Sequence, residues 1–203
     1  MTSTNQSSKN PLLNFPRKIF YGWWIVVLTL IITSSTSSPA FAAVGVWVDS
    51  LEQRFGWSRT QLALAFSLGQ LEASIAGPVV GILVDKIGAK KVIFAGISLV
   101  GIGFILLSQT NSLLMFYFSY GVVMLGASGG GWLPMMTVIN NWFDKKRTLA
   151  MGIGGLGFSM GSFVLVPILA WLVNPSNFGW QITSLGLGIF FLIIALPIAK
   201  FIR

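Results

Sequence analysis

Six long apolar stretches, separated by short polar ones, make up most of this chain of 203 residues. A bilayer core about 30 Å thick is crossed by roughly 17 to 25 apolar residues in a helix that rises about 1.5 Å per residue. Alternation of apolar and polar positions, which is typical of strands, is absent from the sequence. The pattern therefore predicts an all-α membrane protein with transmembrane helices at residues 21–48, 60–84, 92–108, 113–139, 149–173 and 181–199.

Composition supports lipid as the solvent of this chain. Charged residues make up 9% of the sequence and hydrophobic residues 54%, whereas a soluble domain carries about 25% charged residues. The first 18 residues are polar. We expect residues 1–18 to form a disordered cytoplasmic tail and residues 19–203 to form one six-helix transmembrane bundle, with no separate soluble domain.

The basic residues predict how the bundle is oriented. The formal net charge is +8. Arg54 and Arg59 fall on one side of the predicted bundle. The other side holds Lys9, Arg17, Lys18, Lys86, Lys90, Lys91, Lys145, Lys146, Arg147, Lys200 and Arg203. Because cytoplasmic loops are rich in Lys and Arg, both termini are predicted to be cytoplasmic, in a multi-pass protein of the plasma (inner) membrane. Short basic clusters between apolar runs indicate orientation in a membrane rather than binding of nucleic acid.

A cleaved signal peptide is an alternative interpretation of the first stretch. Residues 17–18 are basic and precede an apolar run that reaches Ala-Phe-Ala at 40–42, which resembles a cleavage site. The apolar run continues to residue 48, beyond the length of a signal-peptide core, and five more spans follow. Both observations favour a retained transmembrane helix.

The residue inventory excludes most catalytic chemistry. The chain has no Cys and no His, which removes disulfides, thiolates and the usual zinc ligands. Its water-facing segments hold no carboxylate pair, nucleophile–base set or phosphate-binding loop. Gly152, Gly154 and Gly157 match the letters of a dinucleotide fingerprint, but they follow no predicted strand and lie in an apolar span. Small residues at this spacing favour close helix packing instead. We predict no enzyme activity, no cofactor and no metal.

The loop between the second and third predicted helices carries the most specific motif. Residues 81–91 read Gly-Ile-Leu-Val-Asp-Lys-Ile-Gly-Ala-Lys-Lys. A glycine permits close approach of a helix or a tight reversal of the chain. The stretch resembles the signature of the major facilitator superfamily, Gly-x-Leu-Ala/Val-Asp-Arg/Lys-x-Gly-x-Arg/Lys-Arg/Lys. The resemblance implies a conformational latch that holds two transporter halves outward-open, formed by Gly81, Asp85, Lys86, Gly88, Lys90 and Lys91.

Other stretches are similar to the monocarboxylate-porter and oxalate–formate-antiporter branch of that family. They are Tyr-Gly-Trp-Trp at 21–24, Phe-Gly-Trp-Ser-Arg at 55–59 and Asn-Trp-Phe-Asp-Lys-Lys-Arg at 141–147. The resemblance implies one half of a twelve-helix fold, built as two inverted three-helix repeats. The sequence departs from the family in the fourth helix. Val122 stands one turn before Gly126, where many proton-coupled members have Arg.

The resemblance also implies that the first and fourth helices line the substrate path. Thr33 and Ser37, four residues apart and close to Pro39, would then present hydroxyl groups to the path. Trp132, which follows a run of glycines, would form part of its wall. The alternatives are hydroxyl groups that bond to carbonyls of their own helix, and a tryptophan that only packs.

Glu72 is the only ionisable residue well inside a predicted span. A charge in the bilayer interior is costly, so such a residue normally faces a cavity or a partner. At about 100° per residue, Glu72 lies opposite Gly81 on the second helix, away from the side that carries Ser67 and Gln70. We expect either a proton or cation site on the substrate path, or a neutral carboxyl bonded to a neighbouring helix.

These features favour a secondary transporter, or its N-terminal half, that moves a small organic anion such as a monocarboxylate by alternating access. A proton is the candidate co-substrate. The expected partners are that anion, the lipid bilayer, and a missing C-terminal six-helix half or a second chain. The rivals are a subunit of an ATP-driven transporter, a channel-like protein, and a non-transporting six-helix subunit that works only with a partner chain. Short cytoplasmic loops disfavour the first rival, and the lack of a repeated pore signature disfavours the second.

Overall fold

A computed structural model of the chain describes residues 21–143 and 146–201, which form an all-helical bundle with no strand among them. Its elements are α1 (Tyr21–Ser37), the π-helical η1 (Ser38–Ala42), α2 (Val44–Phe55), α3 (Arg59–Ile87), α4 (Ala89–Ser108), α5 (Leu113–Gly130), α6 (Trp132–Trp142), α7 (Arg147–Val173) and α8 (Gly179–Phe201). Within the described residues, six segments are long and apolar enough to cross a bilayer, as the sequence predicts. The predicted tail at residues 1–18 lies outside the described residues.

Two of the six spans are not the continuous helices that the hydrophobic pattern predicts. The first span divides into α1, η1 and α2, and it extends past residue 48 to Phe55. The fourth span divides at Gly131 into α5 and α6. Both are the first span of a three-span repeat, so the two interruptions occupy corresponding positions in the two repeats.

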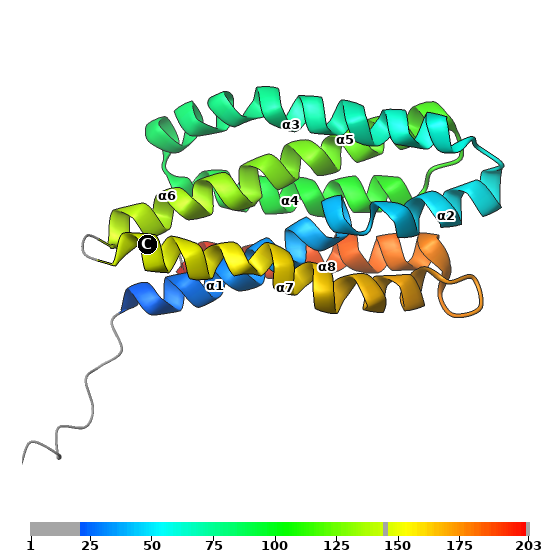
Figure 1. Ribbon diagram of the computed structural model, residues 1–203. Coiled ribbons are helices and arrows are strands. Elements are labelled where there is room, and N and C mark those ends of the chain that lie inside the picture. Colours follow the sequence, from blue (N-terminus) through cyan, green and yellow to red (C-terminus); the bar gives the residue numbers. More distant parts are fainter. Residues whose placement is uncertain (1–20, 144–145, 202–203) are drawn as a thin grey trace, which may run out of the picture.

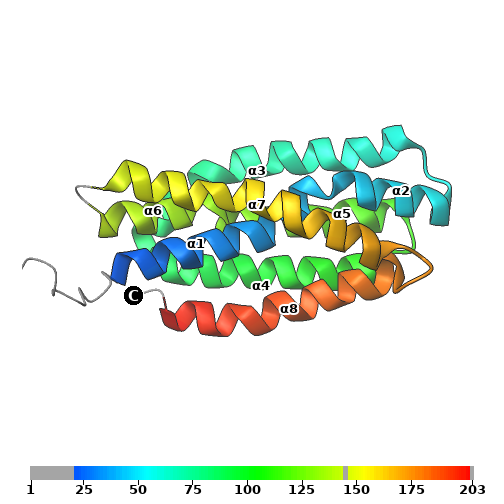
Figure 2. The ribbon, with the colours of Figure 1, turned by 60° about the horizontal axis from the view of Figure 1, so that its bottom comes forward.

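Much of the helix packing follows the same internal symmetry, whereas the extensive α4–α5 contact has no counterpart of similar extent between α8 and α1. The first span of each repeat packs on the second span of the other repeat, as α1 on α7 and α5 on α3, and the two third spans, α4 and α8, pack on each other. All these helices run along one long axis (Figure 1). The view in Figure 2 shows α4 beside α8 and places the start of α1 and the end of α8 at the same end of the bundle. The arrangement is the pair of inverted three-helix repeats expected of one half of a major facilitator fold.

Glycines bring neighbouring helices into backbone contact. A Cβ built on Gly96 of α4 would overlap the backbone of Gly129 and Gly130 of α5. At the α1–α7 pair, a Cβ on Gly157 would lie 2.8 Å from the Leu30 carbonyl oxygen. Gly157 is one of the three glycines that match a dinucleotide fingerprint by letters alone. Its contact with α1 is the close small-residue packing that its place in an apolar span predicts.

The turn between α2 and α3 is fixed by local hydrogen bonds. Gly56 ends α2 with a φ of 68°, a left-handed conformation that glycine adopts without steric cost. Ser58 and Gln61 then form a capping box at the start of α3. The Ser58 side chain accepts from the Gln61 N–H, and the Gln61 side chain accepts from the Ser58 N–H. The two bonds satisfy backbone donors that the first turn of a helix leaves free.

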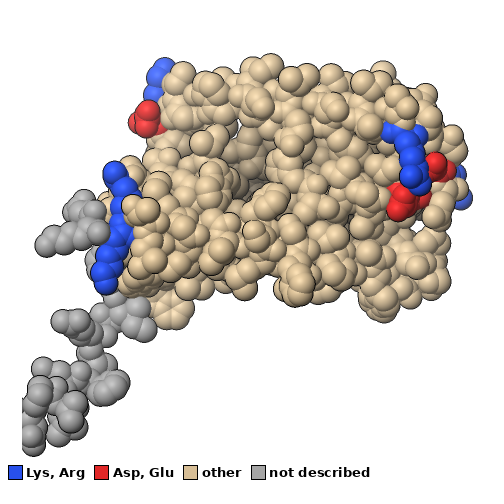
Figure 3. Space-filling model, in the orientation of Figure 1, with Lys and Arg blue, Asp and Glu red and all other residues tan. Residues whose placement is uncertain are grey.

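Apart from Glu72 in the middle of α3, the charged residues of the described chain gather at the two ends of the bundle, which leaves a broad uncharged belt on the face shown in Figure 3. One end carries Asp85 and the basic residues of the α3–α4 and α6–α7 loops. The other carries Asp49, Glu52, Arg54 and Arg59. This separation fits a bilayer around the belt. The sidedness stays a prediction from the positive-inside rule.

Reporter fusions test that sidedness. We expect a reporter that is active only in the cytoplasm to be active at both Met1 and Arg203, because the more basic loops belong on the cytoplasmic side. A fusion at Pro175, in the α7–α8 turn, is the control and should be inactive. An inactive but stably expressed reporter at either terminus would place that terminus outside the cytoplasm and contradict the predicted topology.

Candidate functional site

The first interruption, in the middle of span one, is held by side chains from two other elements. The Ala43 N–H donates to the Ser38 carbonyl at 2.8 Å, which closes a π-helical turn around Pro39. The carbonyls that this turn frees find new donors. The Trp47 indole N–H donates to Pro39 O at 2.9 Å, and the Tyr120 hydroxyl donates to Ala40 O at 2.6 Å. Proline and π-bulges are tolerated in membrane helices when neighbouring groups satisfy the freed carbonyls in this way.

The second interruption lies at Gly131, between α5 and α6. Gly131 has a φ of −102° and a ψ of −130°, which leaves the helical region, and α6 restarts at Trp132 in the middle of the fourth span. The glycines just before it, Gly126 and Gly130, pack on the backbone of α4. In transporters built from inverted repeats, interrupted helices in corresponding positions of the two repeats indicate the substrate site.

Of the predicted path residues, the structure places Thr33 and Ser37 inside the bundle. Thr33 is buried, its hydroxyl donates to Thr29 O at 2.7 Å, and its Cβ faces Gly157 of α7. Ser37, one turn on, is also buried, at the junction with η1. For Thr33 the observed bond is the alternative in which a hydroxyl is satisfied by its own helix.

Trp132 lies at the start of α6 and is 46% exposed. Its ring packs against Gly155 of α7, where a Cβ would lie 3.0 Å from the ring. Trp132 therefore closes the space between α6 and α7 while keeping part of its surface open. Both interpretations of this residue, cavity wall and packing, fit such a position.

Sequence reasoning did not name a small cavity beside the first interruption. The cavity has a volume of about 170 Å³ and is lined by Phe41, Val44, Phe66, Ser67, Gln70, Tyr120 and Met124. Its polar side chains are Ser67 and Gln70 of α3, which are exposed, and Tyr120 of α5, whose hydroxyl donates to Ala40 O. The sequence did contain a signal for this polar site, because Ser67 and Gln70 share the side of α3 that carries Gly77 and Gly81. The cavity joins this polar side of α3 to η1.

Glu72, the remaining predicted path residue, lies on the side of α3 that its helical position predicts and does not line the cavity beside η1. It lines a cleft of about 760 Å³ between α3, α4 and α5, which we call the lateral cleft. One carboxylate oxygen lies against α5, 3.0 Å from where a Cβ on Gly121 would be. The rest of the lining is apolar apart from Ser128, whose hydroxyl donates to Leu125 O at 2.8 Å. Glu72 is thus separated by the body of α3 from Ser67 and Gln70.

Most of the predicted latch loop is helical, because Gly81, Asp85 and Lys86 belong to α3, Lys90 and Lys91 belong to α4, and Gly88 alone links the two helices. Gly88 follows Ile87 and precedes Ala89, with a φ of 88° that favours glycine. Gly81 is exposed, and a Cβ there would meet no atom within 4 Å. Asp85 is exposed near the end of α3, and within the described residues it takes part in no ion pair. The loop therefore presents an unpaired carboxylate and an open glycine on one edge of the bundle.

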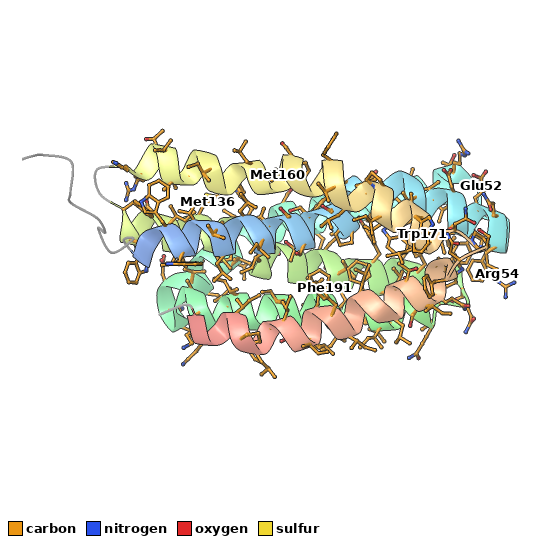
Figure 4. All side chains as sticks on the ribbon, turned by 90° about the horizontal axis from the view of Figure 1, so that it is seen from below. Glu52, Arg54, Met136, Met160, Trp171 and Phe191 are labelled. Atoms are coloured by element: carbon orange, nitrogen blue, oxygen red, sulfur yellow. The ribbon has the colours of Figure 1, made fainter. Side chains whose placement is uncertain are left out.

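The opposite end of the bundle carries the ion pairs of the described chain. Arg59 donates to Glu52 at 2.8 Å and lies 3.5 Å from Asp49. Glu52 and Arg54 project from the end of α2 in Figure 4. These side chains are largely exposed, so the pairs contribute little stability. They help to orient the α2–α3 turn.

The hydrogen bond from Tyr120 to η1 predicts a stability difference. Replacing Tyr120 with Phe leaves Ala40 O buried without its donor, so the free energy of unfolding should fall by about 1–3 kcal/mol. The matched control is Tyr117→Phe on the same helix, which removes a bond to the exposed Gln61 backbone. Thermal unfolding in detergent measures both variants. Equal midpoints for the two would contradict the proposed support of η1.

Comparison with known proteins places this fold in a family. Residues 19–203 match the Major Facilitator Superfamily. The chain is 30% identical to monocarboxylate transporter 2 of Mus musculus over 172 residues, which cover 84% of the chain and 35% of that protein. It is 28% identical to monocarboxylate transporter 13 of Rattus norvegicus over 165 residues, which cover 79% of the chain and 37% of that protein. The chain thus spans about a third of the length of these relatives. It belongs to the Major Facilitator Superfamily and corresponds to the N-terminal half of a transporter of that family.

Proposed function

We propose that this chain forms one half of a secondary transporter that moves a small organic anion, such as a monocarboxylate, by alternating access. The observation that carries the proposal is the pair of mid-membrane helix interruptions, at η1 and at Gly131, in a chain of this family. Such interruptions supply polar backbone near the midplane, where transporters of inverted-repeat design bind their substrates. The similarity to monocarboxylate transporters 2 and 13 supports the monocarboxylate class.

Completion of the substrate site requires groups from beyond the described spans. Between their ends, these spans carry no Lys or Arg, so an anion needs positive charge from another source. The candidates are the C-terminal six-helix half, a second chain, or the N-terminus of a helix. We therefore expect the anion to bind between this bundle and the part that completes the transporter.

Uptake by the completed transporter tests this function. Proteoliposomes that contain the chain with its completing half should take up radiolabelled lactate in a saturable manner, and unlabelled pyruvate should compete. Liposomes without protein and a neutral amino acid of similar size, alanine, are the controls. A correctly folded transporter that moves none of a panel of monocarboxylates above the empty-liposome rate would refute the proposed substrate class.

For the latch loop we expect Asp85 to stabilise one conformation of the transporter rather than to bind substrate. Asp85 is exposed near the end of α3, far from the interruptions, and makes no ion pair within the described residues. Asp85→Asn should leave intrinsic substrate affinity within about twofold, because an amide keeps the size of the side chain and removes only its charge. It should shift the outward-to-inward population by about tenfold if a charge-assisted bond is lost.

Distances between spin labels on the two halves measure that population, and equilibrium binding measures the affinity. Lys86→Gln removes a neighbouring charge, and comparison of its outward-to-inward population with that of Asp85→Asn separates the role of Asp85 from a general effect of charge. Loss of substrate binding in Asp85→Asn with an unchanged distance distribution would contradict the latch role.

A further inference from the structure

The lateral cleft has the size of a ligand site and is open along the side of this six-helix bundle. Its volume of about 760 Å³ falls in the range of sites for drug-sized molecules. Its α3 wall includes Leu71 and Ile75, which are 61% and 73% exposed, so the cleft is open along the side of the bundle. Its α4 and α5 walls include Val92, Leu99 and Leu125. A ligand that fits this cleft would therefore bury an apolar body.

Glu72 gives this apolar cleft a single charged group. Its carboxyl makes no hydrogen bond or ion pair with any other described residue, although the α5 backbone at Gly121 lies beside it. The basic side chains of the described chain lie at the ends of the bundle, whereas Glu72 occupies the middle of α3. A carboxyl in apolar surroundings is costly unless something pairs with it. The missing partner is a hydrogen-bond donor, and a cation is the best one.

We propose that the lateral cleft binds a lipophilic amine, whose protonated nitrogen donates to Glu72 while its apolar body packs between α3, α4 and α5. A lipid acyl chain fills the apolar part of the cleft equally well but leaves the carboxyl unpaired. Charge complementarity therefore selects the amine over the acyl chain. The site is separate from the proposed substrate path, because Ser67 and Gln70 lie on the other side of α3.

Photolabelling tests this assignment without reference to transport. The intact protein in phosphatidylcholine nanodiscs is irradiated with a diazirine derivative of dodecylamine or with the same derivative of dodecanol. Labelled peptides are then identified by mass spectrometry. We expect the amine to label α3, α4 and α5 residues of the cleft about tenfold more than the alcohol does, and unlabelled dodecylamine to compete. Equal labelling by the two probes would mean that the cleft holds only apolar chains, and would overturn the proposal.

Two variants connect the labelling to the carboxyl and to the cleft. Glu72→Gln should reduce labelling by the amine to the level of the alcohol, because a carboxamide keeps the shape and lacks the charge. Ala95→Phe, on the exposed α4 wall, fills the cleft without altering Glu72 and should reduce labelling by both probes. The control Gln70→Glu places a second carboxyl on the opposite side of α3 and should leave cleft labelling unchanged. Undiminished amine labelling in folded Glu72→Gln would refute the amine site.

Discussion

Replacing Gly96 with alanine is expected to prevent the bundle from folding. The added methyl group would overlap the backbone of Gly129 and Gly130, which cannot move aside as a flexible side chain would. On the facing helix, a Cβ at Gly130 would in turn lie 2.6 Å from the Ile97 nitrogen, so the two backbones are in contact along the crossing. Overpacking in a well-packed interior costs about 1–3 kcal/mol and more when only backbone can yield. The α4 and α5 helices would separate, which would displace the break at Gly131 that follows α5.

Gly186→Ala is the matched control for this prediction. Gly186 also lies inside a membrane helix, but a Cβ there meets no atom within 4 Å. Alanine should be neutral there or improve helix propensity by up to about 1 kcal/mol. Size-exclusion chromatography and thermal unfolding of both variants in detergent give the comparison. If Gly96→Ala elutes as a single species with a midpoint within a few degrees of the Gly186→Ala midpoint, the backbone contact is not essential.

The number and order of the spans were predictable because the bilayer imposes one length on every helix. Six apolar stretches met that length, and the structure has six spans at those places within the residues that it describes. The α3–α4 link was also predictable, since Gly88 is the residue that a tight reversal between two helices requires. The position of Glu72 followed from helical periodicity, because a residue nine positions from Gly81 must point to the other side of α3.

The two helix interruptions were not predicted, because hydropathy measures length and not continuity. Pro39 and the glycines of the fourth span signalled that the helices were weak there. The outcome depended on tertiary bonds, from Trp47 and Tyr120 to η1, that no local pattern contains. The same reason explains Thr33. Its hydroxyl could face the substrate path or bond to its own helix. Gly157 of α7 packs closely against the Thr33 side chain, and the hydroxyl donates to Thr29 O of its own helix.

The substitution with the largest expected functional effect is at Glu72, which we proposed from the sequence as a proton or cation site. The family's helix-four arginine is absent from this chain, and Val122 occupies its place. Glu72 is the carboxyl in the middle of the described spans. If the transporter is driven by protons, Glu72 is the candidate in this half for binding and releasing one, because it is the carboxyl that lies well inside a described span. Glutamine at this position matches the neutral acid in shape but cannot titrate.

Glu72→Gln is therefore expected to fold normally and to lose proton-driven uptake, with at least a tenfold fall in the rate under an inward proton gradient. Exchange of labelled for unlabelled substrate at equal pH should continue, because exchange does not require net movement of protons. Proteoliposomes measured across a range of external pH give both rates, and the exchange rate serves as the internal control for folding and insertion. Uptake of wild-type rate with a wild-type pH profile would remove Glu72 from coupling. That outcome would leave the amine site in the lateral cleft to be decided by photolabelling, since labelling depends on the charge of Glu72 at rest and not on its turnover during transport.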